Sequence, residues 1–167
     1  MEQQQTTTPP HLTTRPETHL IGLQYAGPVH TLGTEIPKLW SALWDRVGEI
    51  PRVVDGQVGW SPCIDAGDTH TIFVGVQVEG FTRIPAGMFA LTLPEQHYAT
   101  LTYQGPLNGT GIHDAYVSIY NWLGEQNLQT HSIFHTVERY PERATSNKQA
   151  PDSAENTFEI NIPVVKK

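Results

Sequence analysis

The apolar and polar residues of this chain follow two periods in turn, and the change from one to the other predicts a strand followed by a helix. Residues 19–25 form an apolar segment, which predicts a strand that ends at Ala26-Gly27-Pro28. Residues 36–47 then carry apolar side chains at helical spacing. Thr34 can cap this helix, and Pro37 is tolerated in the first turn because its missing N–H has no intrahelical partner there. Short strands are expected at residues 59–64 and 71–78, so the first unit is β-α-β-β.

The second half of the chain repeats this order. Residues 98–103 alternate and predict a strand, and Thr110 can cap a helix whose apolar positions run from 112 to 123. Residues 132–140 and 157–164 are strand-like, and an extra strand is expected at residues 87–93. Two β-α-β-β units most simply combine into an antiparallel sheet with both helices on one face, which is an α+β fold.

An offset of 78 residues aligns the two halves directly. Seven identities fall within the 26 positions from 19 to 44, against about one or two expected from average residue usage. The matched pairs are His19 and His97, Leu23 and Leu101, Tyr25 and Tyr103, Gly27 and Gly105, Pro28 and Pro106, Gly33 and Gly111, and Trp44 and Trp122. This match indicates an internal duplication, with pseudo-repeats at about residues 18–80 and 87–165.

Two polar segments lie outside these units. Residues 1–17 are rich in Gln, Thr and Pro with almost no large apolar side chain, which predicts a flexible tail. Residues 142–156 are also polar and interrupt two strand-like segments, which predicts a surface loop. We therefore expect a single folded domain at residues 18–167.

Composition and charge narrow the classes of function. Charged residues make up 16% of the chain, below the roughly 25% of typical soluble domains, and 14 Gly and 13 Pro favour sheets joined by short turns. The net charge of −7 argues against direct nucleic-acid binding, which needs clustered Lys and Arg. The single cysteine, Cys63, excludes an intramolecular disulfide and favours a buried thiol in a reducing compartment. The chain shows neither a secretory signal nor a long apolar run, so we expect a cytoplasmic protein without a membrane partner.

The segment 133–140 carries the strongest candidate for chemistry. Side chains two apart in a strand share a face, so Glu138 and Tyr140 are expected to point one way with Phe134, and Val137 the other way. If the helices cover the Val137 face, Glu138 faces outward into a concavity between the halves. A solvated strand glutamate is the alternative interpretation.

The supply of aromatic residues favours a binding role for Glu138. Ring faces attract positive charge and a carboxylate supplies a counter-ion, so this combination suits a lipophilic cation. The aromatic candidates around the carboxylate are Trp40, Trp44, Trp60, Tyr103, Tyr116, Tyr120 and Trp122, with Tyr25 at a strand end. For Trp40 a place in the core is the favoured interpretation, whereas Trp44 and Trp122 are balanced between core and ligand contact. We expect no cofactor and no metal ion, because the eight histidines form no H-E-x-x-H or H-x-x-x-H motif on a helix, and His131 with His135 lacks a third ligand.

The order of motifs resembles a known family. The motifs are Tyr98-Ala-Thr-Leu-Thr-Tyr103-Gln-Gly-Pro106, Ile119-Tyr-Asn-Trp122-Leu, Val137-Glu138-Arg139-Tyr140-Pro141 and Phe158-Glu-Ile-Asn-Ile-Pro163-Val. Over about residues 18–165 the chain resembles the gyrase-inhibitor-like (GyrI-like) effector-binding domain of bacteria. The same domain forms the ligand-sensing part of some AraC-type and MerR-type multidrug regulators. The chain is most similar to stand-alone members, including those carried on mobile gene cassettes.

The resemblance implies a duplicated β-α-β-β fold with a pocket between the halves, and an acidic pocket residue at the position of Glu138 that balances cationic ligands. The ligand-binding residues expected here are Glu138, Tyr103, Trp122, Tyr140, Trp44, Tyr25, Trp60 and Phe134. A stand-alone binder of amphipathic, cationic small molecules is therefore the leading hypothesis, and a binding role is favoured over catalysis.

Two alternatives remain open. The family resembles, in some members, hydrolases that open small-ring compounds with a pocket glutamate, and Glu138 would then act as a general base. The family name also implies a protein-interaction role, with a topoisomerase or a transcription regulator as partner. The oligomeric state and the natural ligand are not indicated by the sequence.

Overall fold

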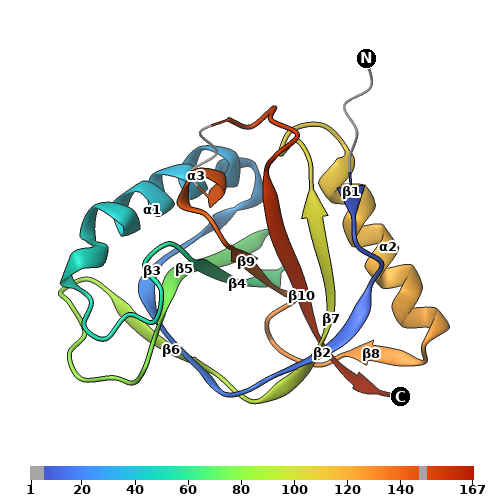
Figure 1. Cartoon of the computed structure of the whole chain (residues 1–167), viewed down its shortest axis with the longest axis horizontal. Coiled ribbons are helices and arrows are strands. Elements are labelled where there is room, and N and C mark those ends of the chain that lie inside the picture. The colour runs from blue at the N-terminus through green and yellow to red at the C-terminus, as the bar shows by residue number, and fades with distance from the viewer. Residues whose placement is uncertain (1–5, 147–149) are drawn as a thin grey trace.

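The protein is built around one antiparallel sheet, described here from a computed structural model that covers residues 6–146 and 150–167 (Figure 1). Ten strands form the sheet in the order β1-β7-β10-β9-β4-β5-β3-β6, with β2 also pairing with β7 and β8 with β10. The strands are β1 Thr6–Thr7, β2 His11–Arg15, β3 Thr18–Pro28, β4 Gly59–Ala66, β5 Thr69–Val78, β6 Phe89–Leu93, β7 Gln96–Gln104, β8 Leu128–Thr130, β9 Thr136–Tyr140 and β10 Thr157–Lys166. The helices are α1 Leu32–Arg46, α2 Gly111–Glu125 and the one-turn α3 Arg143–Ser146.

The two predicted β-α-β-β units are visible in this order. The first is β3-α1-β4-β5, and the second is β7-α2-β9-β10 with the short β8 inserted after α2. Strands β4 and β9 meet at the centre of the sheet, where Ser61 is the register partner of Glu138. The α+β fold is thereby confirmed, with the same order of elements in both units, and the extra strand expected before β7 is β6.

Both long helices lie on one face of the sheet, as predicted, but they cover the face opposite to the one expected from β9. Tyr140 packs with residues of both helical layers, whereas Val137 is fully buried with Trp60 and Phe73 in a separate apolar cluster on the other face. The expectation that the helices cover Val137 is therefore wrong. Strand β9 is buried on both faces. The alternation of its side chains therefore assigns residues to two faces but does not indicate which face the helices cover.

The start of α1 differs from the predicted one, whereas α2 follows Thr110 as predicted. A turn of 3-10 helix at Val29–Thr31 leads into α1, so α1 begins at Leu32 and Pro37 lies in its second turn. Thr34 is therefore inside the helix. Thr31 and Thr110 occupy the N-cap positions of α1 and α2, and neither makes a side-chain capping bond.

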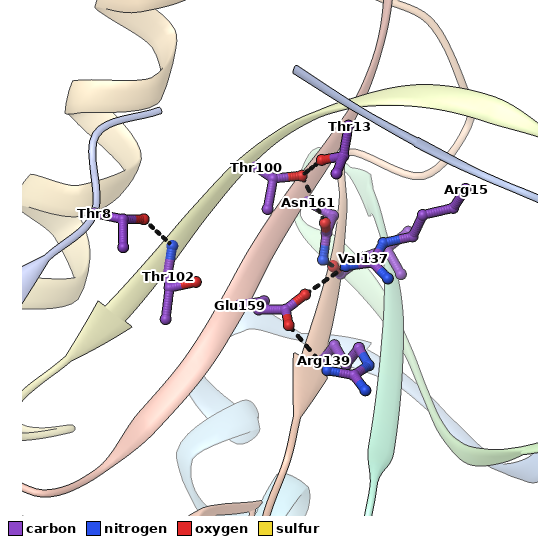
Figure 2. A network of polar contacts seen from close by, with 9 residues as sticks. All are labelled: Thr8, Thr13, Arg15, Thr100, Thr102, Val137, Arg139, Glu159 and Asn161. Atoms are coloured by element: carbon purple, nitrogen blue, oxygen red, sulfur yellow. Dashed lines mark hydrogen bonds and ion pairs between the residues drawn. The ribbon is translucent and has the colours of Figure 1, made fainter. Parts of the chain in front are cut away.

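The N-terminal segment is a strand rather than a tail. Strand β2 pairs along β7, with His11 opposite Thr100 and Arg15 opposite Gln96. Figure 2 shows the polar contacts that hold this segment: Thr13 bonds Thr100, Thr8 accepts from the Thr102 N–H, and Arg15 reaches Glu159. The prediction of a flexible tail is wrong for these residues, because backbone pairing and polar contacts replace the missing apolar burial. Residues 1–5 lie outside the described residues.

Two further segments depart from the sequence-based expectation. The strand expected at 132–140 begins only at Thr136, and Phe134 packs beside Val137 instead of pointing with Glu138. In the predicted surface loop, α3 places Thr145 and Ser146 in buried positions. Residues 147–149 of that loop lie outside the described residues. Within the described part of the chain, no helix is long and apolar enough to cross a membrane.

Candidate functional site

A cavity of about 190 Å³ lies between the two units on the helix-bearing face of the sheet. The first unit contributes α1, β4 and β5 to its wall, and the second contributes α2, β9, α3 and β10. Figure 1 shows these elements, with α3 between α1 and strand β10. The lining residues are Ile36, Trp40, Ser61, Cys63, Ile72, Leu107, Ile112, Glu138, Tyr140, Thr145, Ser146 and Phe158. The predicted pocket between the halves is thus present in the structure.

Three aromatic rings form one continuous wall of this cavity. The ring of Tyr140 stacks on Phe158 with centroids 5.1 Å apart and meets Trp40 edge-on at 5.3 Å. Trp40 in turn stacks on Trp44 at 5.7 Å. A Cβ atom at Gly59 would lie 2.5 Å from the Trp40 ring, so the absence of a side chain at this strand position lets the indole rest on the sheet. Packing therefore fixes the rings before any ligand arrives.

The carboxylate of Glu138 lies at the centre of the strand pair beneath these rings. Tyr116 donates a hydrogen bond from its hydroxyl to Oε2 at 3.0 Å, and Tyr140 donates to Oε1 at 3.3 Å. The Tyr116 hydroxyl also lies 3.1 Å from Oγ1 of Thr136. Hydrogen bonds to an ionised carboxylate are stronger than neutral ones, so two hydroxyls from different elements orient the charge toward the cavity.

The protonation of the neighbouring groups supports this role of the tyrosines. Burial and the nearby Glu138 charge raise the pKa of the Tyr116 hydroxyl well above 10, and the same causes act on Tyr140. Both hydroxyls therefore remain donors at neutral pH. Burial also raises the pKa of the Cys63 thiol, with a further contribution from Glu138. This cysteine is consequently a protonated, weakly nucleophilic group in the cavity wall.

Helix α3 forms part of the cavity wall and is held by contacts between residues distant in sequence. Trp44 donates from Nε1 to Oγ of Ser146 at 2.9 Å, and that hydroxyl donates to the Arg143 carbonyl at 2.7 Å. The Arg143 guanidinium lies over the Trp44 ring at 4.6 Å and donates to the Gly56 carbonyl at 2.8 Å. Trp44 thus joins the aromatic wall to the short helix.

The eight ligand-binding candidates from the sequence fall into three places. Glu138 and Tyr140 line the cavity. Trp44 lies behind Trp40, and Tyr103 lies behind Phe158, with ring centroids 5.5 Å apart. The other four lie away from the cavity: Tyr25 bonds Thr31 at the end of β3, Trp122 borders a shallow surface depression on α2, and Trp60 and Phe134 belong to the cluster on the opposite face.

Several residues that shape the site were not singled out as ligand contacts from the sequence. Trp40 was assigned to the core, and it is both core and cavity wall. Tyr116 and Ile112 are four residues apart, so the sequence indicates that they share one face of α2. In the structure this face lies beside the strand of Glu138. Phe158 and the α3 residues gave no comparable signal, since only the tertiary fold brings them to the cavity.

The histidines offer no evident metal centre. His70 lies 3.4 Å from the Asp65 carboxylate, and its ring meets that of His135 at 6.1 Å. Among the described residues no group of three or more His, Cys, Asp or Glu side chains is arranged to hold a metal ion. His131 follows the end of β8 and His135 precedes the start of β9, so the two histidines do not share a strand face.

Comparison with known proteins identifies relatives of this chain. Residues 11–164 match the family model of Cass2, described as integron-associated effector binding protein. The transcriptional regulator BrlR of Pseudomonas aeruginosa is 29% identical over 118 residues, which cover 69% of this chain and 42% of the regulator. The chain thus spans less than half the length of that relative.

Two solved structures share the fold at low identity. The EcmrR C-terminal domain superposes with a TM-score of 0.70 at 18% identity, covering 98% of this chain and 99% of that domain. SAV2435, solved bound to tetraphenylphosphonium, superposes with a TM-score of 0.65 at 14% identity and 93% coverage of both chains. Because the family model covers nearly the whole described chain, this protein belongs to the integron-associated effector binding proteins.

Proposed function

We propose that this protein binds lipophilic organic cations in the cavity between its two units, with Glu138 as the counter-ion. The observation that carries the proposal is the placement of a carboxylate beneath an aromatic wall. Glu138 is the one carboxylate among the described lining residues, and Trp40, Tyr140 and Phe158 stand beside it.

The physical argument rests on what a cation gains in such a cavity. Aromatic faces attract positive charge by about 0.5–2 kcal/mol per contact, more when water is excluded. A carboxylate in the same partly buried space attracts the cation more strongly than it would in bulk water, because the effective dielectric is lower. Tetraphenylphosphonium, the ligand of the structurally similar SAV2435, combines these two features of charge and aromatic surface.

Two tyrosines orient the Glu138 carboxylate in the absence of a ligand. Tyr116 and Tyr140 hold the carboxylate by donated hydrogen bonds, so its direction does not depend on the ligand. The ligand therefore meets a site whose charge is already aimed, which reduces the ordering cost of binding. A neutral molecule of the same shape gains the ring contacts but lacks the charge interaction.

Calorimetric titration of the purified chain tests the proposal with tetraphenylphosphonium and its neutral analogue triphenylphosphine oxide. We expect micromolar binding of the cation and binding of the neutral compound weaker by about tenfold or more, which corresponds to roughly 1.4 kcal/mol. Glu138→Gln should weaken cation binding by at least about tenfold and leave the neutral compound unchanged.

The matched control is Glu125→Gln, which removes an equal charge from the exposed end of α2. We expect this variant to bind the cation as the unmodified protein does. Equal weakening in both variants would show that the cation responds to net charge and not to the cavity carboxylate. Recovery of the ligand intact by mass spectrometry distinguishes binding from turnover by Glu138.

A further inference from the structure

A groove of about 250 Å³ lies on the face of the sheet opposite the helices. Strands β3, β4 and β5 contribute its floor, and β6 and the segment before β9 stand at its two sides. Strand β6 pairs with β3 only from Thr18 to Gly22, whereas β3 continues to Pro28. The groove therefore lies where β3 extends beyond its neighbour.

The two sides of the groove are apolar. Phe89 and Leu91 of β6 form one side, and Ile133 and Phe134 form the other. Phe89 is 46% exposed and Ile133 is 72% exposed, although large apolar side chains usually lie inside a fold. Isolated exposed apolar residues are common, but these two border the same groove, and such clustering is typical of a binding surface.

The groove differs from the Glu138 cavity in charge. None of its ten described lining residues is charged, and its polar side chains are the amide of Gln24 and the hydroxyl of Thr71. An ion entering the groove would lose water without gaining a counter-ion, which opposes binding. A neutral apolar molecule gains from burial, and the amide and hydroxyl can bond one polar group on it.

We propose that this groove is a second binding site, which takes small uncharged aromatic molecules of one or two fused rings. An apolar cavity of about 150 Å³ is large enough for benzene, so about 250 Å³ accommodates two fused rings. Phe73, Phe89 and Phe134 supply aromatic surface for the ligand. The inference goes beyond the proposed function and does not depend on it, because Pro62 lines the groove whereas its neighbour Ser61 lines the cavity on the other face.

Methyl NMR of the isoleucine-labelled protein locates the ligand. The probe is 2-naphthol, which is neutral at pH 7 and carries one hydroxyl on two fused rings. Ile64 and Ile133 line the groove, whereas Ile36 and Ile112 line the cavity. We expect 2-naphthol to shift the methyl signals of the groove pair, with a dissociation constant of about 100 μM. Shifts confined to the cavity pair, or no shifts at all, would overturn the proposal.

Substitutions in the groove should weaken this binding. Phe89→Ala removes part of one side and should raise the dissociation constant by about 3- to 10-fold. Phe81→Ala is the matched control, because Phe81 is 42% exposed and packs on His19. It should stay within about twofold of the unmodified protein. Thr71→Glu places a charge in the groove and should weaken binding at least about tenfold. Equal effects of the two phenylalanine variants, or full binding by Thr71→Glu, would contradict a site in the groove.

A charged analogue tests the chemical class of the ligand. The anion 2-naphthoate has the same rings as 2-naphthol and should bind at least about tenfold more weakly, because its charge finds no partner in the groove. Equal affinity for the two compounds would show that the groove does not select uncharged molecules.

A second copy of this chain is the competing occupant of the groove. The net charge of −7 opposes self-association, so sedimentation velocity at about 100 μM protein should show a monomer, both for the unmodified chain and for Ile133→Ser. A dimer that Ile133→Ser dissociates would overturn the proposal, because the groove would then be an interface between copies.

Discussion

The hydroxyl of Tyr116 on α2 donates to Oε2 of Glu138 on β9 at 3.0 Å, so the helix of the second unit is tied to the central strand through the cavity carboxylate. This contact has a structural as well as an orienting effect. A carboxylate in a half-buried position destabilises the fold unless hydrogen bonds replace its lost water. Tyr116 supplies one of these bonds and Tyr140 supplies another.

Tyr116→Phe should therefore lower the free energy of unfolding by about 1.5–3 kcal/mol, the range for a hydrogen bond to a charged group. Urea unfolding followed by circular dichroism measures this change. Tyr120→Phe is the matched control, since Tyr120 lies one turn further along α2 and is 45% exposed. We expect the control to change stability by no more than about 0.5 kcal/mol. Equal losses in the two variants would contradict a specific role for the contact with Glu138.

The protein should lose stability in alkaline solution. Burial raises the pKa of Cys63, Tyr116 and Tyr140 in the folded chain. Above the pKa of the unfolded groups, near pH 9 for the thiol and about 10 for tyrosine, the folded chain retains protons that the unfolded chain has released. The free energy of unfolding then falls with rising pH, by about 1.4 kcal/mol per pH unit for each group fully engaged.

Urea unfolding at a series of pH values from 8 to 11 tests this expectation. Tyr140→Phe removes one titrating group, so above pH 10 the free energy of unfolding should fall less steeply with pH, by the equivalent of about one proton. The variant is also less stable at neutral pH. A free energy of unfolding that stays constant between pH 8 and 11 would show that the thiol and the two tyrosines have the same pKa in the folded and unfolded chain, and would contradict the prediction.

The sequence predicted most of the fold because its elements bury one face each. The apolar spacing around Leu43 located α1, and the spacing around Ile119 located α2, because both helices lie on the sheet with a single apolar stripe. The alternation in β9 also placed Glu138 and Tyr140 on one face. It did not indicate the helix-bearing face, because Val137 is buried in a third apolar cluster on the other side.

The elements that were missed carry little apolar surface. Strand β2 has the sequence His-Leu-Thr-Thr-Arg and is held by pairing with β7 and by polar contacts, for which hydrophobic periodicity gives no signal. Helix α3 is too short to show a period, and its hydrogen bond to Trp44 depends on the tertiary fold.

The cavity walls were harder to predict than the carboxylate. An aromatic residue at helical spacing indicates a buried side chain, but it does not reveal whether that side chain borders an empty volume. Trp40 and Trp44 lie four residues apart on one helix face, yet Trp40 lines the cavity and Trp44 stands behind it. Trp60 alternates with the cavity residue Ser61 and so faces the opposite side of the sheet.

Glu159 links the N-terminal strand to the centre of the sheet on that opposite side. Its carboxylate accepts from Arg15 at 2.5 Å and from Arg139 at 2.9 Å, and both guanidiniums lie over the Trp60 ring. Glu159→Gln should lower the free energy of unfolding by about 2 kcal/mol, because it leaves two adjacent cations with a neutral partner. The side chain of Glu159 is 19% exposed, so solvent screening keeps the loss below that of a fully buried pair.

Urea unfolding also measures this loss, with Glu79→Gln as the matched control. Glu79 pairs with Arg52 at 3.1 Å, but its side chain is 62% exposed. Exposed ion pairs contribute about 0–1 kcal/mol, so the control should change stability little. Similar losses from both substitutions would mean that the network around Trp60 is no stronger than a surface ion pair.

Filling the cavity from α2 should weaken ligand binding strongly without removing any group that holds Glu138. Ile112 lines the cavity and is half-buried, so Ile112→Trp places an indole where the ligand would lie. We expect affinity for tetraphenylphosphonium to fall by at least about tenfold, while overpacking costs about 1–3 kcal/mol of stability. Val117→Trp adds the same ring to the exposed side of α2 and should preserve affinity. If Ile112→Trp binds the cation as tightly as Val117→Trp, the ligand does not occupy this cavity, because the cavity cannot hold the introduced indole and the ligand together.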